Sequence, residues 1–174
     1  MDTRDRIELG ILGVLADGDA ALPEIRETLQ HTVGRHVTAG YGSLGPVLND
    51  LEETELVVRI DGTYTLTDAG EERLEELLRT PIDDVRDLPG DARLFTKLTF
   101  LHHLPPDACD EELAALADHF RQAREEWSEV HGYHAAEVDS AVGFRRSLMD
   151  LNARVADVYV EWIEELRERP HPRT

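Results

Sequence analysis

The stretch from residue 41 to residue 66 constrains the fold more than any other, because it predicts a short helix followed at once by a hairpin. Ser43 is a residue type that caps helices, and Pro46 falls in the first turn, where a missing N–H costs nothing. Apolar residues then recur at helical spacing, at Leu44, Val47, Leu48 and Leu51. The sequence therefore predicts one short amphipathic helix that begins after Ser43.

The segment that follows this helix predicts two antiparallel strands. Residues 57–60 are mostly β-branched, and residues 63–66 form a second run of β-branched and aromatic side chains. Asp61 and Gly62 stand between them and suit a tight type I′ turn. A helix that leads directly into a small hairpin is typical of a winged helix-turn-helix, with the hairpin as a two-stranded wing.

Further helices are predicted on either side of this segment. Apolar spacing indicates helices over 5–15 and 22–29, whereas residues 31–42, which carry three glycines and no sustained period, indicate a loop. After the hairpin, Thr67 is placed to cap a helix rich in Glu and Leu. We therefore predict a winged-helix domain over residues 1–80.

The second half of the chain predicts helices only. Two prolines, a glycine and several aspartates make residues 81–91 the best candidate for a linker. Beyond it we expect a helical domain over 92–174, with helices over 92–104, 107–130 and 143–167. The last of these has a stripe close to a heptad pattern, which a partner chain would bury. The predicted fold class is thus mainly α, with an N-terminal winged helix-turn-helix and a C-terminal helical dimerisation domain.

The composition places the chain among acidic globular proteins. Its 174 residues hold 37 Asp and Glu against 18 Lys and Arg, a formal net charge of −19, and Lys97 is the only lysine. Such general acidity fits a protein that works in concentrated salt, where charge repulsion is screened. No apolar run approaches the roughly 18–20 residues of a membrane span and no secretory signal is apparent, so we expect a cytoplasmic protein with no membrane partner. The single cysteine, Cys109, excludes an internal disulfide.

With these elements in place, nearly the whole chain resembles the PadR family of transcriptional regulators, in particular its longer members with a helical C-terminal dimerisation domain. The segment GSLGPVLNDLEETELV over 42–57 is similar to the family's GSLYPAL…RLEEEGLV. The string YTLTDAG over 64–70 is similar to YxLTxAG. Two further segments support the resemblance, ELGILGVLADG over 8–18 and LFTKLTFLHHLPPD over 94–107.

The chain departs from the family pattern at two places near the predicted DNA contacts. Gly45 stands where the family usually has an aromatic residue, often Tyr, so a contact through that hydroxyl is missing. Residues 21–25 read ALPEI where family members often read HGYEI. By the resemblance and by local chemistry, the residues that we place near DNA are Arg35, Tyr41, Ser43, Asn49, Arg59 and Tyr64.

The resemblance implies a homodimer that binds double-stranded DNA at a palindromic operator and acts as a repressor. However, the predicted recognition helix carries no Lys or Arg, the residues that supply most phosphate affinity, and its one base-reading residue, Asn49, has acidic neighbours. A second hypothesis is therefore a winged-helix interaction module without DNA affinity. We expect no enzyme activity and no cofactor, because no nucleophile is paired with a base and no glycine-rich phosphate loop follows a strand.

The aromatic residues of the second half leave two alternatives open. Their helical spacing favours packing in the core or the dimer, whereas the family resemblance allows a small aromatic ligand to sit between the C-terminal helices and the winged helices. The residues concerned are Phe95, Phe120, Trp127, Tyr159 and Trp162.

The histidines predict no metal site. His102 and His103 are adjacent, and neighbours on a helix diverge by about 100°, so we do not expect both to hold one ion. His131 and His134 are three residues apart and would share a face of a helix, but Gly132 disfavours that helix. We therefore interpret these histidines as exposed polar residues.

Overall fold

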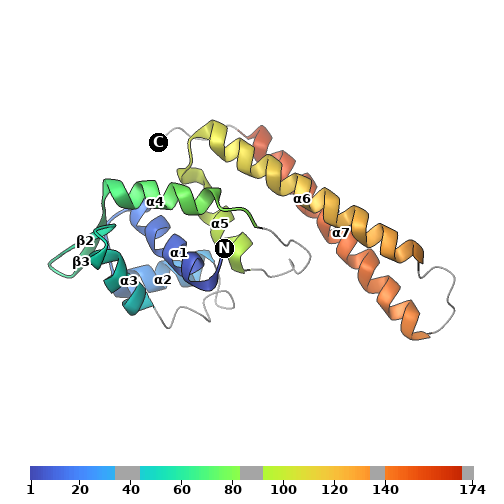
Figure 1. Cartoon of the computed structure of the whole chain (residues 1–174), viewed down its shortest axis with the longest axis horizontal. Helices are drawn as coiled ribbons and strands as arrows, with labels where there is room; N and C mark the ends of the chain where they lie inside the picture. The colour runs from blue at the N-terminus through green and yellow to red at the C-terminus, as the bar shows by residue number, and fades with distance from the viewer. Residues whose placement is uncertain (34–43, 83–91, 134–139, 170–174) are drawn as a thin grey trace. The chain divides into compact units, whose positions relative to one another are not determined.

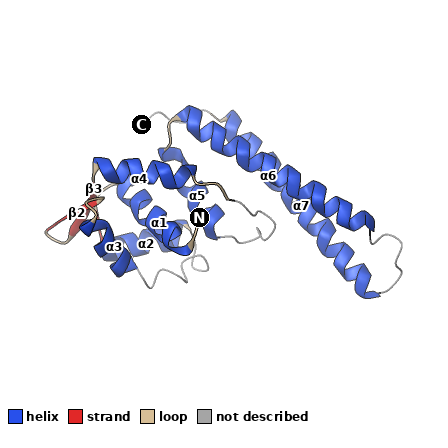
Figure 2. Cartoon of the chain, in the orientation of Figure 1, coloured by secondary structure: helices blue, strands red, loops and turns tan. Residues whose placement is uncertain are grey.

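The computed structural model describes residues 1–33, 44–82, 92–133 and 140–169, and these are mainly helical with one small sheet (Figures 1 and 2), as predicted. In the first half the elements are α1 (Thr3–Asp17), β1 (Ala20–Ala21), α2 (Leu22–Thr32), α3 (Leu44–Glu53), β2 (Val57–Ile60), β3 (Thr63–Leu66) and α4 (Asp68–Arg79). In the second half they are α5 (Ala92–Phe100), the 3-10 helix η2 (Leu101–His103), α6 (Pro106–Tyr133) and α7 (Ser140–Glu168).

The described residues divide into two compact units, and the division differs from the predicted domain boundary. The first unit holds the described parts of residues 1–83 and 90–105, and the second holds the helical hairpin that begins at residue 106. The helix predicted over 92–104 therefore packs with the winged helix as α5 and η2, rather than with the hairpin. The reason is its contact with α1, where the buried ring of Phe100 covers Gly13.

Helix α1 is the centre of the first unit, because it contacts α2, α3, α4, α5 and β3. The sequence predicted one apolar face, yet the apolar residues from Ile7 to Leu15 are buried on every side of the helix. Asp2 and Asp5 form a capping box at its start, with each side chain accepting from the other's backbone N–H. Arg73 of α4 pairs with the buried Glu8 at 2.7 Å, which joins α1 to α4.

The sheet of the winged helix has a strand that the sequence did not predict. Strand β3 pairs with β2 as the expected hairpin and with the two-residue strand β1 on its other side, in the order β1-β3-β2. Asp61 and Gly62 have φ values of 51° and 89°, the positive values that a type I′ turn requires. Two residues are too few to show the alternation of apolar and polar side chains that predicts a strand, so the sequence does not indicate β1.

The junction between the wing and α4 depends on Thr67 and Gly70. The Thr67 hydroxyl accepts from the Gly70 N–H at 3.0 Å, so Thr67 caps α4 as predicted. It also lies 2.9 Å from the carbonyl oxygen of Leu56. A Cβ atom on Gly70 would lie 2.2 Å from that same oxygen, so only glycine fits where α4 meets the backbone after α3.

The second unit is an antiparallel hairpin of α6 and α7, which lie side by side along their lengths (Figure 1). Arg167 binds Asp110 through Nε at 2.7 Å and through an Nη at 3.1 Å, and further along Arg124 reaches Asp157 at 2.6 Å. Both pairs bridge the two helices. No helix in the described residues is long and apolar enough to cross a membrane.

Candidate nucleic-acid interface

Helix α3 presents a mixed face to solvent. Its apolar residues Leu44, Val47, Leu48 and Leu51 are buried, as the spacing predicted. The exposed positions are Pro46, Asn49, Glu52 and Glu53. Asn49 is therefore accessible, as reading an adenine edge would require. Glu52 and Glu53 are also exposed, at the C-terminal end of the helix.

The acidity of α3 is partly neutralised within the first unit. Asp50 lies 2.8 Å from the guanidinium of Arg4 on α1, and both side chains are well exposed. A pair of this kind contributes at most about 1 kcal/mol to stability, but it removes one net negative charge beside Asn49. The N-terminal half of α3 is consequently close to neutral, whereas its last turn stays acidic.

On the wing, the exposed Arg59 lies against the ring of the buried Tyr64. Arg59 and Tyr64 are register partners on β2 and β3, and the Arg59 guanidinium lies 5.4 Å from the centre of the Tyr64 ring. The Tyr64 side chain is only 4% exposed, which corrects its predicted place as a DNA contact. Because Tyr64 faces inward from the sheet, it positions Arg59 instead.

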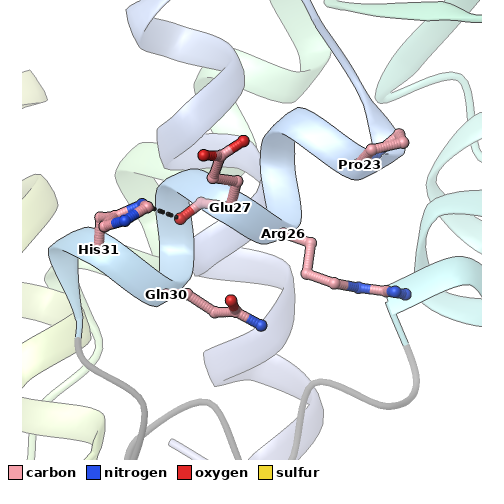
Figure 3. A pocket seen from close by; sticks show the side chains of 5 residues that line it. All are labelled: Pro23, Arg26, Glu27, Gln30 and His31. Carbon is pink, nitrogen blue, oxygen red and sulfur yellow. Dashed lines mark hydrogen bonds between the residues drawn. The ribbon is translucent and has the colours of Figure 1, made fainter.

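A second exposed arginine lies on α2. Arg26 lines a hollow together with Pro23, Glu27, Gln30 and His31 (Figure 3), and the His31 ring bonds to the carbonyl oxygen of Glu27 at 2.9 Å. Within the described parts of the chain, neither Arg26 nor Arg59 is paired with a carboxylate. Arg26 is not among the contacts predicted from the sequence, because a single arginine in an amphipathic helix gives no signal of its surroundings.

Three of the predicted DNA contacts cannot be placed. Arg35, Tyr41 and Ser43 lie outside the described residues. Of the six predicted positions, the structure thus leaves Asn49 and Arg59 exposed on adjoining elements of the winged helix.

The predicted aromatic set is divided between the two units. Phe120 of α6 and Tyr159 of α7 stack, with ring centres 4.5 Å apart and planes 9° from parallel. This arrangement favours the packing interpretation for the pair. Trp127 and Trp162 lie on α6 and α7, whereas Phe95 is an exposed residue of α5 in the other unit.

An apolar stripe on α7 stays open to solvent. Large apolar residues follow a 4-3 spacing along one side of this helix, and the first, Phe144, is 83% exposed. The heptad alternation predicted part of this stripe, but not Phe144, which lies one turn before the residues read from the sequence. Its exposed members are Phe144, Leu148, Leu151, Val158 and Trp162.

These features define a class of protein: a winged helix-turn-helix with a short wing, joined in one chain to an antiparallel helical hairpin. No family model and no curated protein matches the sequence.

Solved structures similar to the chain include PadR of Bacillus subtilis, with 19% identity, 96% of both chains covered and a TM-score of 0.44. They also include the virulence activator AphA of Vibrio cholerae, with 23% identity, 92% of this chain and 95% of that chain covered, and a TM-score of 0.42. A PadR-like regulator of Bacillus cereus has 17% identity over 93% of this chain and 96% of its own, with a TM-score of 0.41. The family that the sequence motifs resemble is thus found among the similar structures. At these identities and scores, the similarity says nothing of what this chain binds.

Proposed function

We propose that the protein is a dimeric, DNA-binding transcriptional regulator of the PadR type that represses from a palindromic operator. The observation that carries the proposal is a pair of exposed arginines, Arg26 on α2 and Arg59 on the wing, neither of which has a carboxylate partner among the residues that the structure describes. In a chain with twice as many acidic as basic residues, ion pairing would be expected to occupy every accessible arginine. Two that stay available on a winged helix are suited to phosphate oxygens.

The proposed arrangement gives each element one task. Helix α3 enters the major groove with Asn49 toward a base edge, and Arg59 and Arg26 contact flanking phosphates. Because phosphate attraction is weak in salt, affinity depends on shape fit and on two linked half-sites. A dimer supplies those two half-sites.

The open stripe on α7 supports dimerisation. A 4-3 apolar spacing is the pattern by which two helices pack in a coiled coil, and burying such side chains stabilises by roughly 1.5–3 kcal/mol each. We propose a second copy of this chain as the occupant, so that the stripe of one protomer covers that of its partner.

Sedimentation velocity at high salt tests the dimer. Leu151→Asp introduces a charge in the middle of the stripe and is expected to yield monomers with unchanged helicity. Gln122→Asp is the matched control, because it adds the same charge at an exposed position of α6. A wild-type monomer, or dimers in both variants, would contradict the proposed interface.

Selection of bound sequences from a random duplex pool at high salt tests the DNA proposal and reports the half-site spacing. With a selected duplex, Arg59→Ala and Arg26→Ala should each weaken binding on all sequences and reduce the salt slope by about one. Asn49→Ala should instead relax preference at one base pair. Arg154→Ala, which removes an exposed arginine of α7, is the control for the lost charge.

Failure to bind any duplex would favour the alternative, a winged-helix interaction module. The observation that favours this alternative is the exposed pair Glu52 and Glu53 at the end of α3. Two carboxylates would be attracted to a basic protein surface and repelled by a phosphate backbone. Retention of dimers without DNA binding is the result that this alternative predicts. Repression is tested separately, by a reporter placed behind the selected operator.

The effector proposal rests on the sequence resemblance alone. We propose a small planar aromatic ligand that lowers DNA affinity. Titration of the fluorescence of Trp127 and Trp162 with planar aromatic acids tests it, and saturable quenching together with release of the duplex is expected. Quenching without saturation would count against the ligand.

A further inference from the structure

Three side chains that the proposed function does not use meet at the end of α1. Asp17 is the last residue of α1, and His102 and His103 lie on η2, 85 and 86 residues further along the chain. Nε2 of His102 lies 3.4 Å from Oδ1 of Asp17, and Nε2 of His103 lies 3.3 Å from the same oxygen. All three residues belong to the first unit.

This meeting corrects the prediction from the sequence. The side chains of adjacent helix residues do point in different directions. The two imidazole rings nevertheless contact each other, with centres 4.1 Å apart and planes tilted by 38°. Both Nε2 atoms thereby reach one carboxylate. Reasoning from the Cβ directions missed this because the rings extend well beyond Cβ.

Each of the two rings also bonds to the backbone. Nδ1 of His102 lies 3.1 Å from the carbonyl oxygen of Thr99, which only accepts, so Nδ1 carries the proton. His103 bonds to the backbone of Gly13. Such bonds from the second nitrogen are what orients histidines at metal sites. In a ring whose Nδ1 carries the proton, Nε2 keeps the lone pair that can bind a metal ion.

The Nε2 atom of His103 is buried without a hydrogen-bond partner, although Asp17 is within ion-pair distance. A buried polar atom left in this way is unfavourable unless something fills the position. A cation between the three ligand atoms would give the Nε2 atom of His103 the partner that it lacks.

We propose that Asp17, His102 and His103 bind one divalent first-row transition ion such as Zn²⁺. In a tetrahedral site with bonds of about 2.0–2.1 Å, neighbouring ligand atoms are roughly 3.3 Å apart. The separations of 3.3 and 3.4 Å from Oδ1 agree with this edge, and all three ligand atoms lie within 4.8 Å of one another. Two imidazoles and a carboxylate suit such an ion and leave one position for water.

The bound ion would join the end of α1 to η2 and so stabilise the first unit. The metal proposal is independent of the DNA proposal. Protein from which the metal has been removed by a chelator can still be tested for duplex binding. A ligand that binds only the folded state raises stability. A free Zn²⁺ concentration of a hundred times the Kd is therefore expected to raise the melting midpoint by about 5–10 °C.

Metal binding is tested on the full chain without an affinity tag, after chelator treatment and dialysis into high salt. Calorimetric titration with Zn²⁺ should show one ion per chain, and Co²⁺ should give the visible absorption of a tetrahedral site. Asp17→Asn and His102→Ala should each weaken binding more than about tenfold. Both side chains are exposed, so these variants are expected to stay folded, which circular dichroism verifies.

His31→Ala is the matched control, because it removes an exposed histidine of α2 outside the cluster. It should bind Zn²⁺ and gain thermal stability as the wild type does. The proposal is overturned if the chain binds no ion, or if Asp17→Asn and His102→Ala bind as well as the wild type. A third outcome, in which Asp17→Asn lowers stability and Zn²⁺ has no effect on the wild type, would show an ion pair in place of a metal site.

Discussion

Lys97 is buried, although lysine is ordinarily an exposed residue. The only lysine of this acidic chain is 1% exposed, and its Nζ donates to the carbonyl oxygen of Thr80 at 3.0 Å, just past the end of α4. A cation at the C-terminal end of a helix interacts favourably with the helix dipole. Lys97 thus joins α5 to α4 inside the first unit.

We expect Lys97→Ala to lower the free energy of unfolding by about 2–4 kcal/mol, because it leaves a cavity and removes a donor from a carbonyl oxygen. Lys97→Met should cost less, since it keeps the apolar stem and removes a buried charge. Urea unfolding followed by circular dichroism measures both values. Equal losses in the two variants would show that the ammonium group, and not the stem, dominates.

The surroundings of the buried Cys109 make its thiol unreactive. Burial, and next the carboxylates of Asp110 and Glu112, raise the pKa of its thiol above the ordinary value. Since only the thiolate attacks, the thiol form that prevails up to a higher pH is unreactive.

Labelling of folded protein with a disulfide reagent at pH 8 should therefore be much slower than labelling of the urea-unfolded chain. The rate for the folded protein should rise as the pH increases through the elevated pKa. A single cysteine makes the absorbance change easy to assign. Equal rates in folded and unfolded protein would contradict the burial of this thiol.

At the scale of elements, the contact of α1 with α5 decides where the first unit ends. A Cβ atom on Gly13 would lie 2.4 Å from the Phe100 ring, so the two helices approach as closely as they do only because residue 13 is glycine. The helix-forming pattern of residues 92–104 predicted a helix there, but not which neighbour it would pack against.

Gly13→Ala is expected to destabilise the protein by about 1–3 kcal/mol through overpacking, even though alanine favours helices. Adding Phe100→Leu should recover part of that loss, because the smaller side chain makes room for the methyl group. A double-mutant cycle by urea unfolding measures the coupling. Additive losses would show that the two residues do not share this contact.

At the scale of the whole molecule, the net charge of −19 sets the conditions in which the protein is stable. Exposed ion pairs such as Arg124 with Asp157 contribute little each, and they leave most acidic residues uncompensated. Self-repulsion is therefore weakened only by added salt, since the Debye length falls from about 10 Å at 0.1 M to about 3 Å at 1 M.

We expect the urea midpoint to rise as KCl is raised from dilute to molar concentration. A variant with Glu125, Glu126 and Glu129 changed to Gln on the exposed side of α6 should depend less on salt. Sucrose, which carries no charge, is the control for general exclusion effects. A midpoint that falls with KCl would show that ion pairing outweighs repulsion.

Much of the architecture was readable from local patterns. The capped start of α4, the Asp61-Gly62 turn and the buried side of α3 were all predicted, because each depends on residues a few positions apart. The inward side of Tyr64 was not, because a four-residue strand does not say which of its faces the core will cover. The hollow beside Arg26 gave no sequence signal either.

The sequence by itself determined the order and kind of the main elements, since helix caps, turn residues and apolar periods act over one or two turns of chain. Only the tertiary structure decided that α5 belongs with α1, that Lys97 is buried, and that Asp17 meets two histidines 85 and 86 residues further along the chain. The physical reason is that these depend on close packing between distant segments. A single glycine or ring at such a contact changes which surfaces meet without changing any local period.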